Sequence, residues 1–200
     1  MRTIIFATGN ENKLREIREI MADIPDLQII SMKEAGVHAD IVEDGNTFEE
    51  NARIKAETVS RITGTIVLAD DSGLSIDYLN GEPGIYSSRY LGEDTSYHIK
   101  NGELIKRLEG VPDEKRTARF VCAVAAAVPG EETRVVRGVM EGQIGYEERG
   151  ENGFGYDPIF FLPSYGKTSA EISQEEKNRI SHRGKALRAV RKVMIEEGIL

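Results

Sequence analysis

The feature that most constrains this chain is a short apolar run that ends in two adjacent carboxylates, Ile66-Val67-Leu68-Ala69-Asp70-Asp71, followed by Ser72-Gly73. Four apolar residues between Gly64 and a Ser-Gly pair are typical of a buried strand. Ligand sites in α/β sheets collect at the carboxyl ends of strands, so the run predicts a metal or substrate site at a strand end. The alternative is an acidic turn, which is the more common structure for such residues taken alone.

Composition limits the class of partner. The chain has 200 residues, 40% hydrophobic and 30% charged, without repeats or a Pro/Ser-rich linker, so we expect one domain over residues 1–200. The formal net charge is −8 and the pI is about 5.1, so nucleic-acid backbone and anionic membrane surfaces would be repelled. We therefore expect no nucleic-acid and no membrane partner. A small anionic substrate would need a local group of cations or a metal ion.

The cellular compartment is indicated by what the chain lacks. Cys122 is the only cysteine, which excludes an internal disulfide and a cysteine-built metal site and fits a reducing compartment. The apolar run at residues 3–7 is too short for a signal-peptide core, and no stretch has membrane-spanning length. We expect a cytoplasmic protein.

Strands and helices alternate at the start of the chain. Residues 3–7 are typical of a strand, and Asn10 is placed to cap a helix that Pro25 would end. The apolar positions of that helix are Leu14, Ile17, Met21 and Ile24. A second helix is predicted after Thr47, where Thr47 and Glu50 form a capping-box pattern, with Gly64 as its stop.

The second half of the chain predicts a hairpin and a terminal helix. Residues 120–128 and 133–139 are typical of strands, and the Pro-Gly turn between them indicates antiparallel pairing. A short strand at 159–162 is followed by a capping-box pattern at 173–176. The last helix carries Leu187, Val190 and Met194. The fold class is therefore α/β, with a mixed sheet and flanking helices.

The first strand-to-helix junction, Thr8-Gly9-Asn10-Glu11-Asn12-Lys13, has the features of an anion site. Backbone N–H groups at a helix start and the positive end of the helix dipole favour phosphate, and Lys13 adds a full charge. The spacing is not that of a Walker A loop, and a plain capped helix with a solvated lysine is the alternative.

Further carboxylates and cations precede the Asp70-Asp71 run. Asn51 and Lys55 lie four residues apart on the second predicted helix and therefore share a face, which is either a polar surface or part of the site. Glu43 and Asp71 together would provide the hard oxygen ligands that Mg²⁺ requires.

Two later segments carry recognition chemistry. In Gly153-Phe154-Gly155-Tyr156-Asp157 a loop could stack Phe154 on a planar base, or it is a glycine turn whose aromatic residues complete the core. Lys177, His182 and Arg183 place three cations near a helix start, where a capping Ser181 with a solvated basic face is the alternative. Ser181 beside His182 is not a protease triad, since that depends on spatial geometry.

Five motifs occur together in this chain. They are Thr8-Gly9-Asn10 with Lys13, Ala69-Asp70-Asp71-Ser72-Gly73-Leu74, Pro83-Gly84-Ile85-Tyr86-Ser87-Ser88-Arg89-Tyr90, Phe154-Gly155-Tyr156-Asp157-Pro158 and Ser181-His182-Arg183. In order and spacing the set closely resembles the inosine/xanthosine triphosphate pyrophosphatase family, from Arg2 to the last helix. The resemblance implies a two-lobed architecture with a central substrate cleft and a homodimer. It also implies Mg²⁺-dependent hydrolysis of dITP, ITP and XTP to the monophosphate and pyrophosphate, which keeps deaminated purines out of DNA and RNA.

The resemblance also assigns residues. It implies Glu43, Asp71 and Asp70 around Mg²⁺, with Asp71 as the catalytic proton acceptor for the water that attacks the α-phosphorus. The implied substrate contacts are Thr8, Gly9, Asn10, Glu11, Asn12, Lys13 and Lys55 for the triphosphate, Ser72 beside the metal, Phe154, Gly155, Tyr156 and Asp157 around the base, and Lys177, His182 and Arg183 at the purine edge. Arg183 would donate to a 6-oxo group, so ATP, whose 6-amino group is a donor, would be disfavoured by roughly 10⁴-fold.

Three other functions are open at this point. A non-catalytic nucleotide sensor could use the same phosphate and base contacts, but it needs no water-activating carboxylate. A related pyrophosphatase branch acts on modified pyrimidine or methylated nucleotides, whereas the loop at Phe154 favours purines. A haloacid-dehalogenase-like phosphatase would use Asp70 as nucleophile, but its Asp-x-Asp pattern is absent.

Overall fold

The computed structural model describes residues 2–200, which form two compact units. Unit 1 comprises the chain up to Asp71, Cys122–Gly138 and His182–Leu200. Unit 2 comprises Ser72–Val121 and Val139–Ser181. The chain passes from one unit to the other several times, so neither unit is a continuous segment.

The strands form one mixed sheet in the order β2-β1-β3-β4-β5-β6-β7. Their bounds are β1 Arg2–Phe6, β2 Leu27–Ser31, β3 Val67–Ile76, β4 Thr117–Ala127, β5 Arg134–Ile144, β6 Phe160–Leu162 and β7 Lys167–Thr168. Strand β1 is parallel to β2 and β3, whereas β5-β6 and β6-β7 are antiparallel. The predicted α/β class with a mixed sheet is confirmed.

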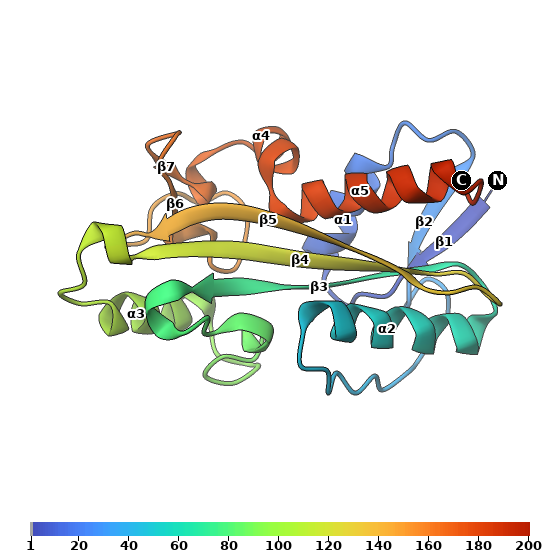
Figure 1. The fold of residues 1–200 in the computed structure, drawn as a ribbon, viewed down its shortest axis with the longest axis horizontal. Coiled ribbons are helices and arrows are strands. Elements are labelled where there is room, and N and C mark those ends of the chain that lie inside the picture. The colour runs from blue at the N-terminus through green and yellow to red at the C-terminus, as the bar shows by residue number, and fades with distance from the viewer. Residues whose placement is uncertain (1) are drawn as a thin grey trace. The chain divides into compact units, whose positions relative to one another are not determined.

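In unit 1 the sheet is covered on both faces. Helices α1 (Glu11–Ile20) and α5 (His182–Glu196) lie on one face and α2 (Phe48–Thr63) on the other (Figure 1). The core below α1 and α5 combines strand residues such as Phe6, Leu68 and Val124 with Ile17 and Leu187 from the helices. The helical spacing of apolar residues in α1 and α5 therefore faces the sheet as predicted.

The ends of the first two helices follow local signals, with two differences. Asn10 caps α1 as predicted, but α1 ends at Ile20, before Ile24 and Pro25. Pro25 disfavours helical backbone only at Ile24, and the chain leaves the helix one turn earlier, at the Met21 C-cap.

Helix α2 begins and ends as predicted. The Thr47 hydroxyl accepts from the Glu50 N–H, and Gly64 ends the helix in the left-handed conformation. The capping box is only half formed, because the Glu50 carboxylate accepts from the Asn46 N–H rather than from Thr47.

Unit 2 has its own apolar core. Helices α3 (Tyr97–Arg107) and α4 (Gln174–Ile180) lie on opposite faces of its part of the sheet (Figure 1). Leu74 and Ile76 of β3 pack there with Leu104 and Phe160. The buried Arg116 donates to three backbone carbonyls, so its charge is solvated by peptide dipoles.

The late helices differ from the sequence prediction. Ser173 caps the short helix α4, which ends at Ile180, and the separate helix α5 begins at His182. The Glu176 carboxylate bonds Tyr165 and Arg179, so no capping box forms at residues 173–176. The structure forms one instead at Thr168 and Glu171.

The predicted hairpin and short strand are present. Strands β4 and β5 are neighbours joined by residues 128–133, a connection too short for a parallel crossover. Both strands are longer than predicted, and the strand predicted at 159–162 is β6. Short 3₁₀ turns occupy Asp77–Leu79, Gly84–Tyr86, Asp113–Lys115, Asp157–Ile159 and Ser169–Glu171. Within residues 2–200, every helix is too short or too polar to cross a lipid bilayer.

We predict that Gly138→Ala destabilises the protein, because a Cβ at this position in β5 would collide with the His182 carbonyl and lie 2.7 Å from the Ala186 N. The expected loss is about 2 kcal/mol or more, since backbone atoms must move. Gly102→Ala, in an exposed part of α3 with nothing near its Cβ, should instead gain about 0.5–1 kcal/mol. Urea unfolding of both variants tests the pair, and equal effects would contradict it.

Candidate active site

Asp70 and Asp71 lie in the middle of β3 and not at its end, so that part of the sequence prediction is wrong. The strand continues because Leu74 and Ile76 have a core to enter in unit 2. The parallel pairing of β1 with β3 nevertheless stops at Phe6 and Leu68. The two carboxylates therefore follow the point where β1 leaves the sheet, which keeps the expected link between a strand end and a site.

The two carboxylates point to opposite faces of the sheet, as adjacent strand residues must. Asp70 faces α1 and α5, where it meets Lys13 and Arg183. Asp71 faces α2, where it meets Lys55. The expected place of Asp70 in the metal shell stays a prediction, which would have to bring together carboxylates from both faces of β3.

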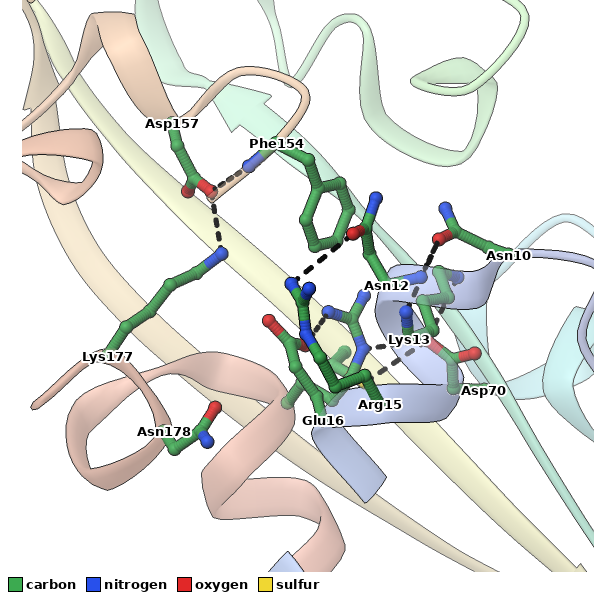
Figure 2. Close-up of polar contacts among 12 residues, drawn as sticks. Asn10, Asn12, Lys13, Arg15, Glu16, Asp70, Phe154, Asp157, Lys177 and Asn178 are labelled. Atoms are coloured by element: carbon green, nitrogen blue, oxygen red, sulfur yellow. Dashed lines mark hydrogen bonds and ion pairs between the residues drawn. The ribbon is translucent and has the colours of Figure 1, made fainter. Parts of the chain in front are cut away.

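Asp70 is the centre of a buried ion-pair network in unit 1. Its Oδ2 lies 3.0 Å from the Lys13 Nζ and 3.3 Å from the Arg183 Nε, and the Arg183 Nη1 donates to Glu16 at 2.5 Å. Figure 2 shows Lys13 and Glu16 on α1 beside Asp70. Burial alone would raise the pKa of Asp70, but the charges of Lys13 and Arg183 hold it well below its ordinary value. Asp70 is therefore an ionised structural anchor.

Asp71 belongs to a second cluster, with Glu43 and Lys55. The Lys55 Nζ lies 3.0 Å from the Glu43 Oε2 and 3.7 Å from the Asp71 Oδ1. Burial raises the pKa of Asp71, which Lys55 opposes only in part. Burial would lower the pKa of Lys55, but Asp71, Asp70 and Glu43 raise it. The cluster therefore combines a firmly charged lysine with a carboxylate that is more basic than usual.

The donor set of this cluster suits a hard cation. The Asp71 Oδ2 is buried and has no hydrogen-bond partner within residues 2–200. Among these same residues no group of three or more His, Cys, Asp and Glu side chains is arranged to hold a metal. Glu43 and Asp71 thus offer two carboxylates, which matches Mg²⁺, an ion that takes few protein ligands and completes its shell with water and phosphate.

Some backbone N–H groups of the junction at residues 8–13 already donate to side chains of the same segment. The Asn10 Oδ1 accepts from the N–H groups of Asn12 at 2.9 Å and Lys13 at 3.3 Å, and the Thr8 Oγ1 accepts from the Asn10 N–H. Two of the amides expected to bind phosphate therefore already have a cap. Space remains at Gly9, where an added Cβ would meet nothing within 4 Å, so a ligand can approach the backbone there.

The loop around Phe154 is organised within unit 2. The Asp157 Oδ2 accepts from the Phe154 N–H at 2.9 Å and from the Lys177 Nζ at 2.6 Å (Figure 2). Its Oδ1 accepts from the Ser169 hydroxyl at 2.7 Å. The Lys177 Nζ also lies 4.7 Å from the centroid of the Phe154 ring. Asp157, expected to read a base edge, thus uses both oxygens to shape the loop.

The predicted site residues fall into one group in each unit. Unit 1 holds Thr8, Gly9, Asn10, Glu11, Asn12, Lys13, Glu43, Lys55, Asp70, Asp71, His182 and Arg183, and unit 2 holds Ser72, Phe154, Gly155, Tyr156, Asp157 and Lys177. Sequence reasoning missed Glu16 and Ser169. Glu16 follows Lys13 by one helical turn, a spacing that places both on one face; nothing near Ser169 in the sequence indicates its contact with Asp157.

Comparison with known proteins places this geometry in context. The sequence profile of the Ham1 family matches residues 4–193. A protein of Bacillus licheniformis named dITP/XTP pyrophosphatase is 52% identical over 188 residues, covering 94% of this chain and 95% of the relative. The Bacillus subtilis protein of the same name is 47% identical over 194 residues, covering 97% of this chain and 98% of the relative.

Solved structures agree with the sequence relatives. A HAM1 protein from Coxiella burnetii has a TM-score of 0.89 at 43% identity, covering 98% of this chain and 100% of that chain. The Staphylococcus aureus Ham1 protein has a TM-score of 0.88 at 40% identity, with the same coverage.

We predict that Asp70→Asn lowers the free energy of unfolding by about 3 kcal/mol or more, because it leaves buried cations without a full counter-charge. Asp44→Asn, on an exposed carboxylate, is the matched control and should be neutral. Denaturant titrations of both variants measure this.

The difference between wild type and Asp70→Asn should also depend on pH. The pKa of Asp70 is depressed from 3.8 on folding, so its contribution is full above the unfolded value and is lost as pH falls below it. The unfolding free energies of the two proteins should therefore differ at pH 7, begin to converge as pH falls below 3.8, and meet only as pH falls through the much lower folded-state pKa of Asp70. If the difference in unfolding free energy between wild type and Asp70→Asn stayed the same at low pH, Asp70 would not be the ionised partner of Lys13 and Arg183.

Proposed function

This chain belongs to the Ham1 family, and we propose that it hydrolyses dITP, ITP and XTP to the nucleoside monophosphate and pyrophosphate. The chain is a dITP/XTP pyrophosphatase, a hydrolase of non-canonical purine nucleoside triphosphates, on the strength of 52% and 47% identity to proteins of that name over nearly its whole length. Such hydrolysis would keep deaminated purines out of DNA and RNA. The observation that carries the reaction is the Glu43-Lys55-Asp71 cluster, with the unpartnered oxygen of Asp71.

The carboxylates of Glu43 and Asp71 would hold a divalent cation, for which we propose Mg²⁺. The fit rests on their oxygen donors and on the buried, unpartnered Asp71 Oδ2. Mg²⁺, when bound, supplies positive charge to the phosphate oxygens and acidifies water. Lys55, which contacts both carboxylates, adds a charge that would bind a phosphate oxygen.

Asp71 would accept the proton of the attacking water. The water oxygen bonds to the α-phosphorus, the bond from that phosphorus to the bridging oxygen breaks, and pyrophosphate leaves. The residues from Thr8 to Lys13, with open space at Gly9, would bind the triphosphate.

Purine recognition would fall to Phe154, Lys177, His182 and Arg183. A 6-oxo group accepts from a cationic donor, whereas the 6-amino group of ATP would set donor against donor. Arg183 already holds Asp70 and Glu16 through Nε and Nη1. A contact with the base therefore requires Arg183 to use another of its five N–H donors or to release one of these partners.

We further propose a cytoplasmic homodimer. Large hydrophobic side chains are exposed within one segment of unit 2, and a second copy of the chain would cover them. They are Tyr78, Tyr86, Leu91, Tyr97 and Ile99. Sedimentation equilibrium measures the mass directly.

The reaction is tested by product analysis with ITP, XTP, ATP and GTP, with and without Mg²⁺. The expected result is Mg²⁺-dependent monophosphate and pyrophosphate from ITP and XTP, with little product from ATP. Orthophosphate would indicate a phosphatase mechanism. Nucleotide binding without turnover would favour a sensor or the pyrimidine-nucleotide branch.

We predict that Asp71→Asn reduces turnover of ITP by about 10³-fold or more, since it removes the proton acceptor and weakens the metal ligand. Folding should be preserved, because the amide fills the same volume. Steady-state kinetics and thermal unfolding of the variant, beside Asp44→Asn, separate the two effects. Wild-type turnover by Asp71→Asn would refute the mechanism.

We predict that Arg183→Ala loses both 6-oxo selectivity and stability, because Glu16 and Asp70 would lose a buried partner. Arg183→Lys keeps the positive charge but not the planar array of donors. It should therefore retain more stability while its preference for ITP over ATP still falls. The ratio of kcat/KM values for the two nucleotides, with unfolding midpoints, checks this. Full selectivity in both variants would remove Arg183 from base recognition.

A further inference from the structure

The loop at residues 153–157 is held from a second side, by helix α3. On the first side Asp157 bonds the Phe154 N–H, Lys177 and Ser169. On the second side the Tyr97 ring lies against Gly155, within 3.6 Å of the position a Cβ would take, and meets the Tyr156 ring edge-to-face at 5.1 Å. No motif in the sequence connects α3 with this loop.

Asn101 of α3 makes the polar contact on this second side. Its Nδ2 donates to the Gly155 carbonyl at 3.2 Å and to the Glu148 Oε1 at 2.8 Å. The side chain is buried, and its Oδ1 has no hydrogen-bond partner in the part of the chain that the structure describes. An unsatisfied buried oxygen is unfavourable. The orientation of this asparagine is therefore set by its two donor hydrogens.

Glu148 in turn fixes Asn101. Its second oxygen lies 2.5 Å from the Nδ1 of His98, which precedes Asn101 by one helical turn on α3. His98 is largely exposed, whereas the Glu148 side chain is mostly covered. The Glu148 carboxylate thus connects the exposed His98 with the buried Asn101 amide. The Asn101 NH₂ group can donate to both Glu148 and the Gly155 carbonyl in only one orientation.

We propose that Asn101, oriented by Glu148, is a positioning residue for purine selectivity. The inference rests on the proposed function, in which Phe154 and its loop contact the base. The Phe154 N–H is tied to Asp157 and the Gly155 carbonyl to Asn101, so the peptide groups on both sides of the loop's tip have fixed directions. These directions determine where the Phe154 ring and the exposed backbone groups meet the base edge.

The test compares Asn101→Asp with the double variant Asn101→Asp/Glu148→Gln. In the single variant the new carboxylate at position 101 faces the Glu148 carboxylate and the Gly155 carbonyl, so three acceptors meet without a donor. In the double variant the amide introduced by Glu148→Gln can donate to the new carboxylate. This restores the link between positions 101 and 148 but not the bond to the Gly155 carbonyl.

We expect Asn101→Asp to lower the unfolding midpoint and the double variant to recover it. Both should keep a KM for ITP raised about tenfold, a change typical of one lost hydrogen bond, with a smaller change in kcat. Both should also show a reduced preference for ITP over ATP. Calorimetric titration of ITP in EDTA should show the same weakening without turnover.

Lys106→Ala, at an exposed position on the same helix, is the control and should match wild type. The inference is overturned if the double variant recovers wild-type KM and selectivity together with stability, since the asparagine would then be structural only. Asn101→Ala supplies the same readout if Asn101→Asp does not fold. A wild-type enzyme that shows no preference for ITP would instead refute the proposed function, whatever position 101 does.

Discussion

The structure of unit 1 depends on an ionised carboxylate that is buried between two cations. Asp70 meets Lys13 and Arg183, and Arg183 also meets Glu16, so two positive and two negative groups meet in one place where all but Lys13, which is partly exposed, are buried. Each charge alone would be expensive to bury, and together they are tolerated only in one arrangement. The network joins β3, α1 and α5, which are far apart in the sequence, and so fixes which faces of the two helices meet the sheet.

The pleat of β3 places the side chains of Asp70 and Asp71 on opposite faces of the sheet. Because neighbouring residues alternate between faces, Asp70 is committed to the neutral network while Asp71 is delivered to the other face, beside Glu43 and Lys55. Each aspartate has one buried oxygen without a hydrogen-bond partner among residues 2–200, but only around Asp71 do the carboxylates outnumber the cations, two to the single lysine of the cluster. Excess negative charge of this kind favours a cation. Two residues of identical chemistry thus acquire different partners from the periodicity of a strand.

Sequence reasoning succeeded where the signal was local. The Asn10 and Thr47 caps, the Gly64 stop and the hairpin depend on neighbouring residues, and the structure has all four. It failed at the end of β3, because the strand continues through turn-forming residues only when the Leu74 N–H finds the Ser87 hydroxyl and a core accepts its side chain. Contacts between residues far apart in the sequence likewise determine the partners of Asp157 and the division of the last segment into helices α4 and α5.

In the proposed function, the loop at residues 153–157 would link such distant contacts to selectivity. Asp157 and Lys177 neutralise each other at 2.6 Å, so this pair offers little net charge to a purine ring, which is itself uncharged. Discrimination between 6-oxo and 6-amino purines must then come from the direction of individual donors and acceptors, and direction depends on how the backbone is held. The sequence predicts Phe154 as a stacking residue. The groups that orient it, Asn101 and Glu148, carry no local signature, because their effect passes through one carbonyl oxygen far along the chain.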